Sequence, residues 1–194
     1  FKLHIGSQIH DINLPLAGEH NVNNALAAAA CAHALNINVS DIVIGLENAR
    51  PAKGRLNSQI LGKHRLIDDT YNANPHSVRA AAKVLAAQTG TQVMVLGDIG
   101  ELGEAAVSEH QSLGRTIATT GIDVLLCVGE YAKATVAGAK EVADINAQAF
   151  ADKDSLLQYL QPYLQAHQAK PCTVLFKGSR SMTMETLIHA LVEE

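Results

Sequence analysis

The chain has 194 residues, a net charge of -4 and an apolar fraction of 47%, which is typical of a globular protein with ample material for a core. The negative net charge argues against a nucleic-acid-binding surface based on bulk charge, although a few basic side chains suffice to bind an anionic nucleotide. No apolar run approaches the roughly 20 residues that a membrane-spanning helix requires, so we expect no membrane span.

Cysteine and histidine usage argues against a metal site in this chain. The three cysteines, Cys31, Cys127 and Cys172, are far apart, odd in number and set among apolar residues. This pattern favours buried free thiols in a reducing cytoplasm over disulfides or a metal site. The nine histidines form neither an HExxH motif nor a cluster with cysteines, so a zinc protease or a structural zinc site is not expected.

Residues 1–50 predict a hairpin followed by two helices. Apolar and polar residues alternate on either side of Gly6-Ser7, which predicts a half-buried hairpin. The alanine-rich segment 22–35 predicts a helix, and Ser40 or Asp41 can cap a second, shorter one. These few elements are typical of the end of a larger domain. Because the chain begins with Phe instead of Met, we expect it to be the interior of a longer polypeptide.

The composition changes at residues 49–54, where one proline, one glycine and two basic residues predict a linker. We therefore expect one domain to end at residue 50 and a second to occupy residues 51–194. Beyond the linker, continuous apolar runs alternate with helical patterns, which favours an α/β fold with a Rossmann-like, mostly parallel sheet covered on both faces. Strands are predicted at 55–60, 64–69, 92–97, 123–128, 147–150 and 172–176, and helices from Pro75, near 106–120, after Tyr131, near 153–167 and over 182–192.

The stretch 65–75, with the sequence RLIDDTYNANP, carries the clearest local signal. Its apolar start predicts the end of a buried strand, and residues 69–74 then predict a polar loop. Asn74 can cap a helix whose first position is Pro75, where no amide hydrogen is needed. A strand, an acidic and amide-rich loop and a capped helix are typical of the ligand-binding edge of an open α/β sheet.

Three further predicted strands also end in polar or glycine-rich loops. In a parallel sheet the carboxyl ends of the strands meet at one edge, so four such loops predict a functional edge, whereas two alone would be ordinary helix caps. In the loop 177–180, Arg180 can form a bidentate contact with a carboxylate or phosphate, and the backbone amides at a helix start favour an anion. From the residues alone, a solvated helix start explains that loop equally well. The four loops are 69–74, 97–98, 129–130 and 177–180.

Several other sites are disfavoured. The glycines of segment 97–103 are spaced three apart and accompanied by acidic residues, which argues against a dinucleotide loop. Gly62-Lys63 is followed by His64, so this chain contains no complete phosphate-binding P-loop. No GxSxG elbow supports a serine hydrolase. Among the nine histidines, only His20 and His110, which lies one turn into a predicted helix, are functional candidates; no catalytic residue is assigned, and His110 is the one histidine considered for that role.

Five motifs occur in order and together resemble the Mur ligase family over essentially all 194 residues. The resemblance implies that residues 1–50 are the tail of a central P-loop ATPase domain and that residues 51–194 are the carboxyl-terminal domain. The UDP-binding domain, the P-loop and most ligands of Mg²⁺ would then lie upstream. The motifs are GEHNVNNALAA at 18–28, GRL at 54–56, DDTYNANP at 68–75, GDIGELG at 97–103 and KGSR at 177–180.

The branch of the family that is most similar adds D-Ala-D-Ala to UDP-MurNAc-tripeptide in peptidoglycan synthesis. In that branch ATP converts the tripeptide carboxylate into an acyl phosphate, which the dipeptide amine attacks. The resemblance implies a cytoplasmic, monomeric ligase with ATP and Mg²⁺ as cofactors, of which this chain alone would be inactive. A stand-alone nucleotide- or anion-binding module remains the alternative, and an upstream P-loop would separate the two. A dinucleotide oxidoreductase is a third, weaker alternative.

The resemblance also assigns ligand-binding residues. Asn21 and Asn24 match the positions that contact adenine, Arg55 matches a contact to the ATP phosphates, and Asp69 matches a contact to the ribose hydroxyls. The residues implied for D-Ala-D-Ala binding all belong to the loops of the predicted functional edge. They are Asn72, Asn74, Ser179 and Arg180.

Overall fold

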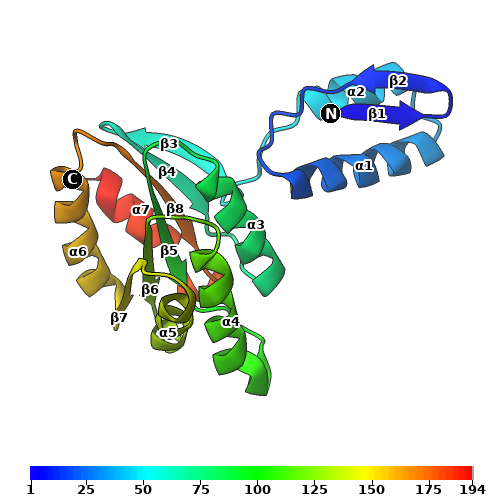
Figure 1. Ribbon diagram of the computed structural model, residues 1–194. Helices are drawn as coiled ribbons and strands as arrows, with labels where there is room; N and C mark the ends of the chain where they lie inside the picture. The colour runs from blue at the N-terminus through cyan, green and yellow to red at the C-terminus, as the bar shows by residue number, and fades with distance from the viewer. Residues whose placement is uncertain (194) are drawn as a thin grey trace. The chain divides into compact units, whose positions relative to one another are not determined.

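The computed structural model describes residues 1–193, which form two compact units divided after Ala52 (Figure 1). The division lies two residues beyond the boundary expected at residue 50. Each unit has its own buried core. Among the described residues no helix is both long enough and apolar enough to cross a membrane.

The first unit pairs β1 (Lys2–Ile5) with β2 (Gln8–Asp11) in the predicted hairpin, followed by α1 (Glu19–Ala34) and α2 (Val39–Glu47). Apolar side chains from the hairpin and both helices form its core. The buried residues of this core are Leu3, Ile12, Ala25, Ala29, Ile42 and Leu46.

Two expectations for this unit are wrong. The helix α2 begins after Asn38, which does not cap it through its side chain, instead of after Ser40 or Asp41. The backbone of Asn36 is left-handed (φ 59°), so α1 ends before it, at Ala34, and α2 can already begin at Val39. Cys31 is exposed instead of buried. The buried stripe of α1 runs through Ala25 and Ala29, and a residue two positions further lies on another face of the helix.

The second unit is an α/β domain with one six-stranded sheet in the order β3-β4-β8-β5-β6-β7. Only β3 runs antiparallel to its neighbour, so the predicted mostly parallel sheet is confirmed. The strands are β3 (Asn57–Leu61), β4 (His64–Asp69), β5 (Thr91–Gly97), β6 (Val124–Val128), β7 (Asn146–Phe150) and β8 (Cys172–Lys177). The helices are α3 (Pro75–Ala86), α4 (Ala106–Ala118), α5 (Ala132–Val142), α6 (Lys153–Ala166) and α7 (Glu185–Val192), with short 3-10 turns η1 (Gly103–Ala105) and η2 (Arg180–Met182).

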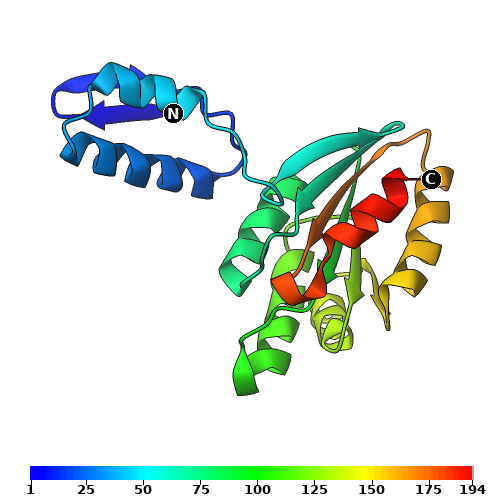
Figure 2. The ribbon, with the colours of Figure 1, turned by 180° about the vertical axis from the view of Figure 1, so that it is seen from behind.

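Helices cover both faces of this sheet (Figures 1 and 2). The helices α3, α4 and α5 pack on one face, and α6 and α7 pack on the other. The predicted apolar stripe of α3 is confirmed, since Val78, Ala81, Ala82 and Leu85 are all buried. The last helix starts three residues later than predicted because η2 occupies residues 180–182.

The topology gathers the four polar loops. The strands β4, β8, β5 and β6 are neighbours and parallel, so their carboxyl ends share one edge as predicted. The strand β8, last in the chain, lies between β4 and β5, which places its loop in the middle of that edge. The predicted cap of α3 is confirmed as a reciprocal capping box. Asn74 Oδ1 accepts from the backbone N–H of Ser77 at 2.8 Å, and Ser77 Oγ accepts from the backbone N–H of Asn74 at 3.1 Å.

At the opposite end of the same strands, His64 ties β4 to β8. The backbone N–H of Cys172 donates to His64 Nδ1 at 3.0 Å, so that nitrogen must be unprotonated. Burial lowers the pKa of His64, although a hydrogen bond to the backbone of Leu164 acts in the opposite direction. The neutral ring is therefore the form that the fold requires.

The free energy of unfolding should fall as the pH drops below about 6.5, the unperturbed histidine pKa, because the unfolded chain then binds a proton that folded His64 resists. We predict that His64→Gln reduces this loss of stability in urea titrations between about pH 5 and 7. His189→Gln, at an exposed position in the same unit, should not reduce it. An unchanged pH dependence after replacement of His64 would contradict this account.

Candidate functional site

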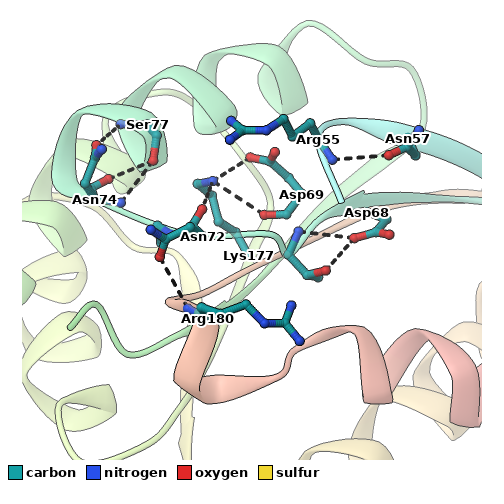
Figure 3. Close-up of polar contacts among 11 residues, drawn as sticks. Arg55, Asn57, Asp68, Asp69, Asn72, Asn74, Ser77, Lys177 and Arg180 are labelled. Carbon is teal, nitrogen blue, oxygen red and sulfur yellow. Dashed lines mark hydrogen bonds and ion pairs between the residues drawn. The ribbon is translucent and has the colours of Figure 1, made fainter. Parts of the chain in front are cut away.

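A buried ion pair joins the last residues of β4 and β8 (Figure 3). Lys177 Nζ lies 2.7 Å from Asp69 Oδ2, and the side chains of Lys177 and Asp69 are 3% and 13% exposed. The same ammonium donates to the backbone carbonyls of Asn72 at 3.0 Å and Asp69 at 3.4 Å. The three donors of one lysine thus fix the loop after β4 onto the end of β8.

Asn72 extends this network to the next loop. Its Oδ1 accepts from the backbone N–H of Ala73 at 2.9 Å and from that of Arg180 at 3.3 Å. The residue is exposed, so its position is set by hydrogen bonds and not by burial. The asparagine therefore connects the loop after β4 with the loop after β8.

Arg180 presents an exposed guanidinium at the start of η2 and forms an ion pair with Glu185, the first residue of α7. The side chains of Arg180 and Glu185 are 55% and 20% exposed. Burial opposes the charge on Glu185, but the hydrogen bond from Arg180 and the nearby charges of Arg180 and Lys153 keep its pKa below the ordinary value. The carboxylate is therefore ionised at neutral pH and orients the guanidinium.

Ser179 is buried and faces the loop after β5. Its backbone N–H and its hydroxyl both donate to the carbonyl of Asp98, at 2.9 and 2.8 Å. Its Oγ also lies 3.1 Å from Ser181 Oγ. The predicted dipeptide-binding role of Ser179 stays a prediction, and the contact that the structure gives it is with Asp98.

Asp98 joins three strand ends, a role that the sequence analysis missed. Its carbonyl accepts hydrogen bonds from the backbone N–H and the hydroxyl of Ser179. Its carboxylate accepts from the backbone N–H groups of Glu130 at 2.7 Å and Tyr131 at 3.1 Å. A Cβ at Gly129 would lie 2.3 Å from Asp98 Oδ2, so only glycine leaves room for this contact. The sequence does contain a signal for this contact: Asp98 follows β5, and α5, which follows β6, begins without a capping side chain of its own. The N–H groups at a helix start favour a carboxylate.

Arg55 stacks on Tyr71. The guanidinium carbon lies 4.5 Å from the ring centroid, and both residues are exposed. The backbone N–H of Tyr71 donates to the Gly54 carbonyl at 3.0 Å, and Gly54 has φ 71°, a conformation that glycine adopts without strain. The GRL and DDTYNANP motifs therefore meet in space, although no sequence pattern signals this pairing.

His110 is buried and supports the loop after β5. Its Nε2 accepts from the backbone N–H of Ile99 at 3.1 Å, and its Nδ1 lies 2.7 Å from the Ala106 carbonyl, which assigns the proton to Nδ1. The ring stacks on Tyr131 at a centroid distance of 4.7 Å. Both nitrogens thus contact backbone groups, and this geometry favours a positioning role over proton transfer.

In the first unit, Asn21 and Asn24 contact each other at the start of α1. Asn24 Nδ2 donates to Asn21 Oδ1 at 3.2 Å, and Asn21 Nδ2 donates to the Ala17 carbonyl at 2.7 Å. Asn24 is exposed. Among residues 1–193 no group of three or more acidic, cysteine or histidine side chains is placed to hold a metal ion.

Comparison with known proteins gives consistent matches over this chain. The family model described as Mur ligase, glutamate ligase domain, matches residues 54–180. The UDP-N-acetylmuramoyl-tripeptide–D-alanyl-D-alanine ligase of Escherichia coli is 40% identical over 186 residues, which are 94% of this chain and 39% of that protein. The corresponding ligase of Haemophilus influenzae is 37% identical and is covered over 40% of its length. The chain therefore spans about two fifths of these relatives.

Solved structures agree with these matches. A crystal structure of MurF from Acinetobacter baumannii superimposes with a TM-score of 0.93 at 48% identity, covering 100% of this chain and 42% of that one. MurF from Thermotoga maritima in complex with ADP gives a TM-score of 0.80 at 21% identity, covering 96% of this chain and 41% of that one. The second match shows a shared fold.

We predict that Asp98→Ala loosens the start of α5, since two backbone N–H groups lose their acceptor. The expected cost is about 1 kcal/mol in the free energy of unfolding, with faster amide exchange at Glu130 and Tyr131. Asp152→Ala is the matched control, because Asp152 caps α6 through Ser155 N at 2.8 Å. Equal exchange rates at Glu130 and Tyr131 in both variants would contradict the anchoring role of Asp98.

Proposed function

This chain belongs to the Mur ligase family, and we propose that it is the nucleotide- and acceptor-binding part of an ATP-dependent ligase that adds D-Ala-D-Ala to UDP-MurNAc-tripeptide. The curated relatives that carry this name support the proposal, as does the Acinetobacter baumannii structure. The observation that carries it is the connected cluster of Asp69, Lys177, Asn72 and Arg180 at one edge of the sheet. ATP supplies the phosphoryl group that activates the tripeptide carboxylate.

The donor and acceptor groups fit a nucleotide. The Asp69 carboxylate can accept from ribose hydroxyls while Lys177 fixes its orientation. The exposed guanidinium of Arg55 suits the phosphates, since it offers several N–H donors and a permanent charge. Within the first unit, taken by itself, the side-chain amides of Asn21 and Asn24 have both the donors and the acceptors that a base edge requires. We assign Mg²⁺ to the reaction but no Mg²⁺ ligand to residues 1–193.

The loop after β8 fits an anionic dipeptide. Arg180 has five N–H donors, so it can hold Glu185 and a substrate carboxylate together. The backbone of Arg180 is fixed by Asn72, which keeps the guanidinium at the edge of the sheet. We therefore assign D-Ala-D-Ala recognition to Arg180, with Asn72 beside it. Asn74 and Ser179 have defined structural contacts and complete the proposed set.

We predict that the full-length gene product forms the D-Ala-D-Ala adduct with ATP and that Arg180→Ala raises the KM for D-Ala-D-Ala roughly tenfold or more, since a lost charged hydrogen bond costs about 1.5–3 kcal/mol. The KM for ATP should change little. Arg115→Ala is the matched control, because Arg115 also pairs with a glutamate but lies in α4.

Two outcomes would count against this proposal. Equal losses for D-Ala-D-Ala and ATP in Arg180→Ala would reject the acceptor role of Arg180. Ligase product from the 194-residue chain alone would reject its assignment as an incomplete part. If the chain is instead a stand-alone anion-binding module, the full-length gene product should bind nucleotide but form no D-Ala-D-Ala adduct.

We predict that Asp69→Asn raises the KM for ATP roughly tenfold, because the ribose hydroxyls lose a charged acceptor. The substitution keeps the shape of the side chain and still offers an oxygen to Lys177. Asp68→Asn is the matched control, since Asp68 Oδ1 accepts from the backbone N–H and the hydroxyl of Thr70 at 3.1 and 2.6 Å. An unchanged KM for ATP in Asp69→Asn would exclude the ribose contact.

A further inference from the structure

We propose that Lys177 is a positioning residue that holds the nucleotide contact and the acceptor contact of this ligase in one fixed arrangement. The inference rests on the proposed function, because it assumes that Asp69 contacts ATP and that Arg180 contacts the dipeptide. Lys177 itself is 3% exposed and is not expected to touch either substrate. Its effect would pass through the groups that it binds.

The ammonium of Lys177 makes three contacts (Figure 3). Lys177 Nζ contacts Asp69 Oδ2 at 2.7 Å, the Asn72 carbonyl at 3.0 Å and the Asp69 carbonyl at 3.4 Å. A lysine has three N–H donors and no acceptor, so these three oxygens match its full capacity. The carboxylate orientation and the path of the loop after β4 are therefore set by the same group.

Asn72 connects these contacts to Arg180. The backbone carbonyl of Asn72 accepts a hydrogen bond from Lys177 Nζ, while Oδ1 of Asn72 accepts one from the backbone N–H of Arg180 at 3.3 Å. A continuous path of contacts thus runs from Asp69 through Lys177 and Asn72 to Arg180. Loss of the ammonium would remove a contact to the carboxylate and a contact to the loop at the same time.

The strands β4 and β8 are aligned by their backbones. Asp69 and Lys177 are register partners at the ends of β4 and β8, so the backbone already holds them side by side. An ion pair is not needed to align these strands, and a buried pair is a weak source of stability because both charges must be desolvated. The charge of Lys177 is therefore explained better by a positioning role than by a purely stabilising one.

Lys153 provides a matched control within the same unit. Its Nζ also has three acceptors, namely the Thr183 carbonyl at 3.1 Å, Thr183 Oγ1 at 2.9 Å and Thr186 Oγ1 at 3.0 Å. These contacts join α6 to the start of α7 and involve neither Asp69 nor Asn72, although the charge of Lys153 also helps to keep Glu185, the partner of Arg180, ionised. Lys153→Met is therefore a control for the ATP contact: it reports the cost of removing a three-bonded lysine without disturbing Asp69.

The test compares Lys177→Met with Lys153→Met in the full-length gene product. We expect Lys177→Met to raise the KM for ATP and the KM for D-Ala-D-Ala together, each roughly tenfold, since each contact loses a charged hydrogen bond or its geometry. Lys153→Met should leave the KM for ATP unchanged. In an Asp69→Asn background, Lys177→Met should raise the KM for ATP much less than in the parent enzyme, because the two residues act through one contact.

Each outcome decides the inference. A KM for ATP in Lys177→Met that matches that of Lys153→Met would overturn it, as would an unchanged KM for D-Ala-D-Ala in Lys177→Met, even if Asp69→Asn and Arg180→Ala behave as proposed. Unchanged constants in Asp69→Asn and Arg180→Ala would instead reject the proposed contacts, and the inference with them. If Lys177→Met does not fold, Lys177→Arg decides, since its planar fork keeps the charge but cannot match three convergent acceptors. Parent-like constants in Lys177→Arg would then overturn the inference.

Discussion

The proposed binding edge depends on one buried ion pair, between Lys177 at the end of β8 and Asp69 at the end of β4. The pair is possible because β8 lies between β4 and β5, which brings together residues that are 108 positions apart. Asp69 can then present a carboxylate whose direction is fixed before any ligand arrives. Such preorganisation lowers the entropic cost of binding, since fewer side chains must be ordered on association.

The surrounding loops are fixed mainly through their backbones. Asp98 holds the start of α5 and the Ser179 loop, and His110 holds the loop after β5. By contrast, the side chains of Arg55 and Arg180 are exposed, each oriented by one neighbour. This division suits the proposed ligase function, because rigid loops can place a few long, charged side chains that remain accessible to anionic substrates.

Most elements of the second unit could be predicted because each carries a strong local pattern. The cap at Asn74, the apolar stripe of α3 and the polar ends of four parallel strands all follow from residues close in sequence. The contacts of Lys177, Asp98 and Glu185 could not be predicted in this way. They depend on strand order and on loop geometry, which neither propensity nor spacing encodes. The exposure of Cys31 was missed because its apolar neighbours do not reveal which face of α1 is buried.

Amide hydrogen exchange of the full-length gene product, measured with and without D-Ala-D-Ala in the presence of ATP and UDP-MurNAc-tripeptide, tests most directly whether this edge binds the substrates. We expect added protection in the loops at the carboxyl ends of β4, β5 and β8, over residues 69–74, 98–103 and 177–181. The turn at residues 61–64, at the opposite end of β4, should not change. Protection confined to that opposite end, or none at any of these segments, would contradict the assignment of this edge as the binding site.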